Sequence, residues 1–233
     1  MNFENKLISG QFIKRYKRFF VDVNLKNKIV TAHCPNSGSM MGLLKKNNKV
    51  WLTEAINKKR KLKYTLQIIK DGKSKVGVNT HLTNKIVLDA LKKKLIKDYE
   101  NVTYIKSEQI FGENTRFDFY LEETKIKTFL EVKNVTLKRR TNIAEFPDSV
   151  TSRGAKHLRE LINAKKKGFD AYLLFVIQRE DCDKFEIAKD IDPEYSKALI
   201  SAINHDVKIL CYDCKFSSKG ILLNNKIKFH INE

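Results

Sequence analysis

Two short apolar runs between Arg116 and Asn134 carry charged side chains where buried strands normally carry none. The first run contains Asp118, and the second contains Glu131 and Lys133. Side chains alternate between the faces of a strand, so a hairpin that joins the runs would bring Asp118 close to Glu131, with Lys133 on the same face as Glu131. A buried carboxylate pair is unfavourable unless its charges are compensated. The sequence therefore predicts that the two carboxylates bind a divalent cation while Lys133 faces a phosphate.

The same spacing also fits a solvated hairpin with ordinary surface charges. An Asp followed at a distance by Glu-x-Lys arises easily by chance in a chain with 31% charged residues. Most charge patterns of this kind belong to solvated faces. The surrounding elements must therefore decide between the two interpretations.

Residues 1–82 are predicted to form a small all-β domain. Strands are expected at 21–25, 49–53, 62–68 and 76–78. Turn signals such as Asp71-Gly72 separate them, and short strands with turns at this spacing are typical of a small barrel. We expect an OB-like barrel, with an SH3-like barrel as the alternative.

Residues 83–233 are predicted to form an α/β domain with a mixed sheet. Helical spacing begins at residue 83, with Thr83 or Asn84 as the expected N-cap. Further strands are expected at 102–111, 116–121, 127–135, 171–177 and 207–212, and further helices at 152–167 and 192–205. Thr151 or Ser152 is expected to open the second helix, and the segment from Lys138 to Asn142 is expected to be a basic loop.

This order of elements resembles the core of the PD-(D/E)xK nuclease superfamily. That core has a helix, a three-stranded meander, a second helix and a further strand. Asp118 falls on the second predicted strand of the meander, and Glu131 and Lys133 fall on the third, as the core requires. The agreement between strand order and motif position favours a metal-dependent phosphodiester hydrolase over a solvated hairpin.

The charge of the chain favours a polyanionic partner, with nucleic acid first and an anionic membrane second. The formal net charge is +19, from 46 basic and 27 acidic residues. A chain rich in Lys, Asn and Ile also fits an AT-rich genome, so the charge supports this interpretation without proving it. Basic and aromatic residues alternate at 14–20, and Arg15, Lys17 and Arg18 are candidate contacts to nucleic acid. The alternative is that the aromatic rings belong to the barrel core.

The sequence gives no sign of a membrane protein. Its apolar runs fall short of the roughly 20 residues of a membrane-spanning helix, and its first residues lack the apolar segment of a signal peptide. We therefore expect a cytoplasmic protein with reduced thiols and no membrane partner. Cys211 and Cys214 form a lone Cys-x-x-Cys pair, which favours buried thiols over a structural zinc site. An edge strand of either domain could pair across a homodimer.

Several stretches, in order, resemble the sugar fermentation stimulation protein A family. The matching stretches are 15–19, 33–38, 78–80, 116–119, 131–137, 146–151 and 153–161. The resemblance implies an OB-like domain joined to a PD-(D/E)xK domain, with nuclease activity on DNA or RNA. The family is also associated with non-specific DNA binding and a regulatory role in sugar use.

The resemblance further implies roles for single residues. The implied catalytic residues are Asp118, Glu131, Lys133 and Glu108. Asp118 and Glu131 would bind Mg²⁺ or Mn²⁺, which prefer oxygen ligands, and Lys133 would position or activate the attacking water. Arg153 and His157, on the helix that faces the site, would contact the scissile phosphate.

Two other functions remain open at this stage. The chain could be a DNA-binding regulator whose acidic site does no chemistry, and metal-dependent turnover separates this class from a nuclease. It could also be an RNA-processing enzyme with the same site, which recognition of the 2′-OH would distinguish.

Overall fold

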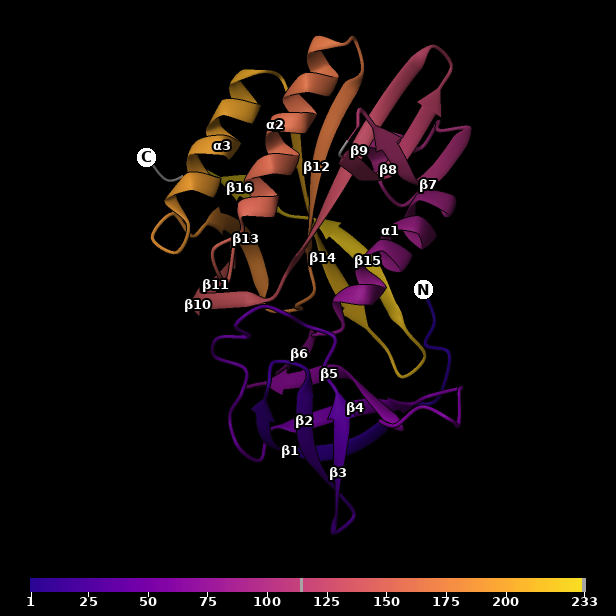
Figure 1. Ribbon diagram of the computed structural model, residues 1–233, viewed down its shortest axis with the longest axis vertical. Coiled ribbons are helices and arrows are strands. Elements are labelled where there is room, and N and C mark those ends of the chain that lie inside the picture. Colours follow the sequence, from indigo (N-terminus) through magenta and orange to yellow (C-terminus); the bar gives the residue numbers. More distant parts are fainter. Residues whose placement is uncertain (114, 232–233) are drawn as a thin grey trace.

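The computed structural model describes residues 1–113 and 115–231, in which an N-terminal barrel adjoins a larger α/β domain (Figure 1). The barrel strands are β1 (Ile8–Tyr16), β2 (Phe20–Leu25), β3 (Lys28–His33), β4 (Lys49–Glu54), β5 (Tyr64–Asp71) and β6 (Ser74–Gly77). They are ordered β3-β2-β1-β4-β5-β6, and a parallel pairing of β3 with β5 closes the barrel. Alternate side chains of these strands fill an apolar interior that includes Phe12, Val21 and Leu66. The predicted OB-like barrel is confirmed.

The α/β domain begins with a short 3-10 helix, and its described residues include three α-helices. Its helical elements are η1 (Thr80–Leu82), α1 (Thr83–Lys92), η2 (Lys97–Tyr99), α2 (Ser152–Lys166) and α3 (Pro193–Asn204). Its strands are β7 (Tyr104–Phe111), β8 (Thr115–Glu123), β9 (Ile126–Val135), β10 (Leu137–Arg140), β11 (Asn142–Phe146), β12 (Asp170–Ile177), β13 (Cys182–Ile187), β14 (Lys208–Phe216), β15 (Ile221–Lys226) and β16 (Lys228–His230). None of the helices in the described ranges is long and apolar enough to cross a membrane.

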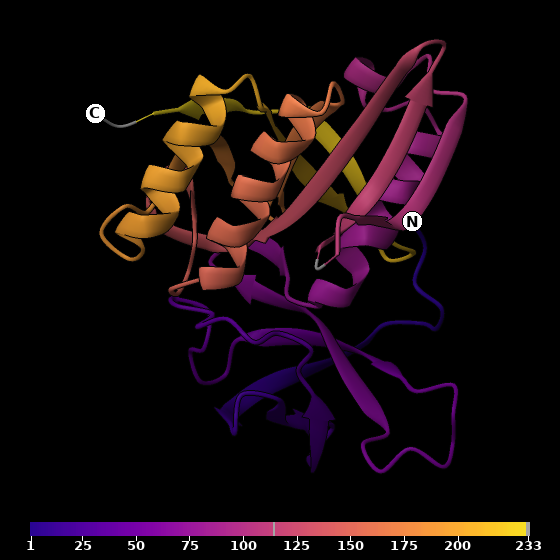
Figure 2. The ribbon, with the colours of Figure 1, turned by 45° about the horizontal axis from the view of Figure 1, so that its top comes forward.

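The main sheet of this domain is mixed and is covered on both faces. Its order is β15-β14-β12-β9-β8-β7, with β9, β12 and β14 parallel and the outer pairs antiparallel. One face packs against α1 and the other against α2 and α3, which Figure 2 shows on opposite sides of β9. Because β12 is covered on both faces, residues 171–177 are buried throughout, as their continuous apolar run predicts.

The helix ends follow local chemistry, with one exception. The Thr151 side chain accepts a hydrogen bond from the backbone N–H of Gly154, so the predicted cap of α2 is confirmed. Gly168 follows α2 with φ +85°, a conformation that favours glycine. The predicted cap of α1 is wrong, because η1 precedes that helix and the side chain of Asn79 caps η1 instead. Asn84 is thereby available for another contact, described below.

The predicted basic loop is also wrong, because this segment forms the hairpin of β10 and β11. The guanidinium of Arg139 bonds both carboxylate oxygens of Glu145 at 2.9 Å, and that of Arg140 pairs with Glu186. These ion pairs neutralise the basic residues, so the strands can join a four-stranded sheet ordered β10-β11-β13-β16. The four cysteines are free and buried.

The two domains are joined through buried polar contacts. The Arg179 side chain is 1% exposed, and its Nη2 lies 2.7 Å from Asp71 of the barrel and 3.0 Å from Asp181 of its own domain. The backbone N–H of Gly77 donates to the carbonyl oxygen of Gln178 at 2.9 Å. A Cβ atom at Gly77 would lie 2.2 Å from the Gln178 side chain, so this approach requires glycine. These contacts hold the barrel in a defined position against the α/β domain.

Candidate active site

Asp118 lies where strands β8 and β9 separate. Their regular pairing ends at Phe119 and Leu130, and beyond it the Oδ2 atom of Asp118 accepts the backbone N–H of Val132 at 2.8 Å. Phe117 packs in the apolar cluster beneath α2, whereas Phe119 packs in the cluster beneath α1. Residues two apart in a regular strand share a face, so β8 is irregular at Asp118. The carboxylate therefore occupies the gap between the two strands.

Glu131 is opposite Asp118 on β9 and is 2% exposed. Its Oε1 atom accepts a hydrogen bond from Lys133 Nζ at 2.7 Å and contacts His157 Nδ1 of α2. Its Oε2 atom is buried and lacks a hydrogen-bond partner among the described residues. A buried carboxylate oxygen without a partner is unfavourable, so this atom is suited to a ligand that supplies positive charge.

The two carboxyl groups are in different protonation environments. Burial, followed by the negative charge of Glu131, raises the pKa of Asp118 to about 6. Burial also acts to raise the pKa of Glu131, but Lys133 and His157 outweigh it, so the pKa of Glu131 lies below its ordinary value. One carboxyl is thus firmly ionised, while the other titrates near neutral pH.

His157 is buried on α2, and both of its ring nitrogens are engaged. Arg153 Nε donates to Nε2 at 3.3 Å, so Nε2 is the acceptor and Nδ1 carries the proton that faces Glu131. This geometry makes His157 a residue that orients Glu131. The predicted contacts of Arg153 and His157 with a phosphate stay predictions.

Glu108 lies on β7 opposite Asp118, at an irregular position with φ +56°. Its carboxylate is exposed and forms an ion pair with Arg116 at 2.8 Å. Among the described residues, it makes no such interaction with Asp118 or Glu131. Its role in the metal site stays a prediction.

The predicted nucleic-acid contacts of the barrel fall into two groups. The guanidinium of Arg15 donates to the carbonyl oxygens of Arg18, Asn36 and Gly38 at 2.6–2.9 Å, so Arg15 has a structural role in shaping residues 36–39. Lys17 and Arg18 form the exposed tip of the β1–β2 hairpin, both with positive φ. Contact of any of the three with nucleic acid stays a prediction.

Comparison with known proteins identifies relatives along nearly the whole chain. Residues 81–220 match the "Sugar fermentation stimulation protein RE domain", and residues 13–78 match the "SfsA N-terminal OB domain". The chain is 54% identical to the sugar fermentation stimulation protein homolog of Pelagibacter ubique, with 98% of each chain covered. It is 40% identical to the homolog of Maricaulis maris, with 100% of each covered.

The chain belongs to the sugar fermentation stimulation protein family. A solved structure of SfsA from Pyrococcus furiosus, in complex with Ca²⁺, is similar to it with a TM-score of 0.89 and 26% identity. That likeness covers 99% of this chain and 98% of the other, so the two-domain architecture is shared.

The structure of this family member brings together two residues that the motif did not indicate. Asn84 Nδ2 donates to Asp118 Oδ1 at 2.7 Å, which fixes the carboxylate from the α1 side. Tyr195 of α3 is fully buried, and its hydroxyl lacks a partner among the described residues. Burial, followed by the charge of Glu131, holds the pKa of Tyr195 well above its ordinary value. The helical pattern placed Asn84 at the start of α1, but only the tertiary fold links it to Asp118.

The donor set suits a hard cation that keeps most of its water ligands. Within residues 1–113 and 115–231, no cluster of three or more His, Cys, Asp or Glu side chains is arranged to hold a metal ion. The site instead offers the two carboxylates of Asp118 and Glu131, with Glu131 Oε2 unpartnered. Mg²⁺ is commonly bound by one or two carboxylates together with waters and substrate phosphates. The residues present therefore fit such an ion.

Proposed function

We propose that this protein is a metal-dependent nuclease that hydrolyses phosphodiester bonds of DNA or RNA at Asp118, Glu131 and Lys133. The observation that carries the proposal is the buried, unpartnered Oε2 atom of Glu131 beside the half-buried carboxylate of Asp118. Two carboxylates close enough for the charge of Glu131 to raise the pKa of Asp118 are unfavourable in an empty protein interior and favourable around a divalent cation.

The chain's own residues would share the chemistry as follows. Asp118 and Glu131 would hold Mg²⁺ or Mn²⁺, which lowers the pKa of a bound water and neutralises charge on a phosphate. Lys133 Nζ, fixed 2.7 Å from Glu131 Oε1, is positioned to stabilise negative charge on the reacting phosphate or to orient the water. His157 and Asn84 keep the two carboxylates in place.

A specific observation also favours a second function, that of a nucleic-acid-binding regulator without catalysis. The Oε1 atom of Glu131 already faces Lys133 and His157, so the charge of this carboxylate is compensated within the chain. The relatives' names describe stimulation of sugar fermentation and no reaction. Metal-dependent turnover distinguishes the two functions.

The deciding experiment measures cleavage of labelled single- and double-stranded DNA and RNA with EDTA, Mg²⁺ or Mn²⁺ at low salt. Lys133→Ala is compared with the wild type and with Lys127→Ala. Lys127 is an exposed lysine at the other end of β9, on the same face by strand alternation. We expect metal-dependent cleavage by the wild type and Lys127→Ala, and a loss of roughly 100-fold or more in Lys133→Ala.

Binding of the same substrates in EDTA provides the control for folding and affinity. Lys133→Ala should bind within a few-fold of the wild type. Tight, salt-sensitive binding without metal-dependent cleavage of any substrate would support the regulator. A parallel loss of binding and cleavage in Lys133→Ala would contradict the catalytic role of Lys133.

A further inference from the structure

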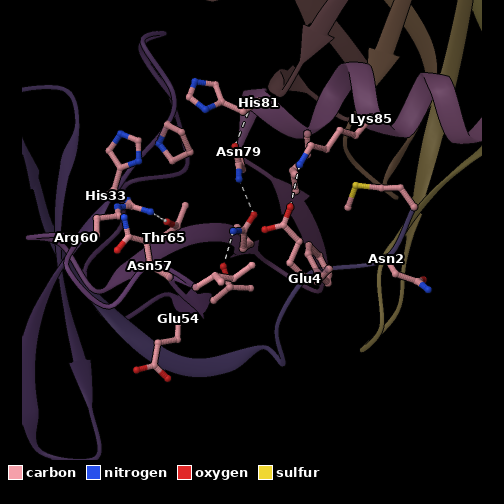
Figure 3. Close-up of a pocket in the computed structure, with 18 of the residues that line it drawn as sticks. Asn2, Glu4, His33, Glu54, Asn57, Arg60, Thr65, Asn79, His81 and Lys85 are labelled. Atoms are coloured by element: carbon pink, nitrogen blue, oxygen red, sulfur yellow. Dashed lines mark hydrogen bonds and ion pairs between the residues drawn. The ribbon is translucent and has the colours of Figure 1, made fainter.

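A cavity of about 960 Å³ lies between the barrel and α1. Its walls come from β3, the β4–β5 connection, β5, η1 and α1, and the first residues of the chain close one side. Figure 3 shows His33 and Arg60 of the barrel on one side and Lys85 of α1 on the other. Pockets that hold small molecules measure roughly 300–1,000 Å³, so this cavity has room for a nucleotide.

Two imidazole rings, those of His33 and His81, line this cavity, and the ring of Phe19 continues the row beyond its lining. The ring centres of Phe19 and His33 are 6.4 Å apart, and those of His33 and His81 are also 6.4 Å apart. Phe19 is 43% exposed, and neither it nor the two histidines belong to the apolar core clusters of the described residues. The row leads from the hairpin tip of Lys17 and Arg18 to η1. Exposed rings beside cations are how proteins hold the bases of single strands.

The floor of the cavity is polar and held in a fixed arrangement. Asn79 Nδ2 donates to Gln67 Oε1 at 2.8 Å, and Gln67 Nε2 donates to Thr53 Oγ1 at 2.7 Å. Both residues are buried, with Gln67 5% exposed and Asn79 6% exposed. Arg60 also lines the cavity, and its guanidinium donates to Thr65 Oγ1 at 2.9 Å. Oriented amides and a guanidinium can pair with the edge of a base, because each offers hydrogen-bond groups in one plane.

The cavity and the candidate active site share the first turn of α1. Leu82 and Lys85 line the cavity, while Asn84 bonds the carboxylate of Asp118. Asn84 and Lys85 are consecutive residues, so the cavity and the candidate active site meet at the same turn of α1. His33, the most buried of the imidazoles in the row, has a lowered pKa because of burial, followed by Arg60 and His81. A neutral ring of this kind can lie against a base without repelling Arg60.

We propose that this cavity receives an unpaired nucleobase of the strand whose phosphate lies at Asp118, Glu131 and Lys133. The base lies against His33 and His81, and its edge meets Arg60 and the amides of Asn79 and Gln67. A base inside a duplex is stacked on both faces and cannot enter such a cavity, so the preferred substrate is single-stranded or frayed nucleic acid. This inference rests on the proposed binding of nucleic acid, but it does not require catalysis.

The test is a binding measurement in EDTA, where cleavage cannot interfere. Single-stranded oligonucleotides carry the fluorescent base 2-aminopurine at successive positions, and a duplex of the same sequence serves for comparison. Two cavity variants are used: Ala55→Trp, which fills the cavity from the β4–β5 connection, and His81→Ala, which removes one ring. The matched control is His230→Ala, which removes an exposed histidine on β16. Circular dichroism and melting curves verify that each variant folds.

For the wild type and His230→Ala, we expect fluorescence to change at one position of the single strand, as the base leaves its neighbours and enters the cavity. Ala55→Trp and His81→Ala should lose that change and bind single strands about tenfold more weakly, with duplex binding unaltered. Single-strand binding by both cavity variants at wild-type affinity would overturn the proposal, and so would an equal loss for single strand and duplex. If base binding follows this pattern but metal-dependent cleavage is absent, the cavity proposal stands and the nuclease proposal fails.

Discussion

Replacing Asp118 by Asn should make the metal-free protein more stable above pH 6. The pKa of Asp118 is about 6 in the folded protein, against 3.8 for an ordinary aspartate. Between these values the folded state binds more protons than the unfolded state, so this carboxyl lowers the free energy of unfolding as the pH rises from about 4 to about 6. The difference between a pKa of about 6 and one of 3.8 corresponds to about 3 kcal/mol of unfolding free energy. Asp118→Asn removes this pH-dependent loss.

The surroundings of residue 118 can accommodate the amide. Its oxygen can keep the hydrogen bond from the N–H of Val132, and its NH₂ group then faces Asn84. The Asn84 amide can turn to present its oxygen, so no donor is left facing a donor. The variant is therefore expected to fold as the wild type does.

Urea denaturation in EDTA, at pH values from about 4 to about 8, measures the effect. The difference in unfolding free energy between Asp118→Asn and the wild type should rise by about 3 kcal/mol across this range. Mg²⁺ or Mn²⁺ should stabilise the wild type and not the variant, because the ion binds only the folded site. Asp183→Asn, at an exposed position on β13, is the control and should show a flat difference. A flat or falling difference for Asp118→Asn would refute the assigned burial of this carboxyl.

Three further substitutions test the domain junction, the loop at Gly38 and the orientation of Glu131. Arg179→Ala should lower the free energy of unfolding by about 3–5 kcal/mol, since it removes a buried guanidinium that bonds Asp71 and Asp181, and denaturation should then show separate transitions for the two domains. Gly38→Ala should lower the melting temperature, because the new Cβ would lie 2.4 Å from a carboxylate oxygen of Asp148; an unchanged melting temperature would contradict this contact. His157→Gln should weaken metal-dependent cleavage more than it weakens nucleic-acid binding in EDTA, and equal losses would indicate a merely structural role.

The fold could be predicted largely because local patterns agree with the tertiary structure. Alternating apolar residues at 21–25 and 64–68 do lie on barrel strands, although Leu62 precedes β5, and the Thr151 cap opens α2 as expected. The hairpin of β10 and β11 was missed because its basic residues are neutralised by carboxylates as distant in sequence as Asp190 and Glu186. No local pattern carries that information.

The candidate site was likewise predicted where local spacing determines it and missed where it depends on tertiary contacts. The spacing of Asp118 and Glu131 predicted two carboxylates on neighbouring strands, and the structure has them there. The bond from Asn84 depends on η1, which displaces the cap of α1 and frees the amide side chain. The orientation of Glu131 by His157 depends on how α2 crosses the sheet. Contacts between elements that are far apart in sequence cannot be read from spacing alone.

The contacts of Arg179 and Gly77 that fix the barrel against the α/β domain affect how the two domains work together. A barrel on a flexible tether would sample many distances from Asp118, whereas this one is fixed by buried contacts on both sides of the junction. If the barrel binds a strand and the α/β domain cleaves it, cleavage would occur at a fixed distance from the bound nucleotide. A strand that the barrel binds at its end would therefore be cleaved into fragments of one length.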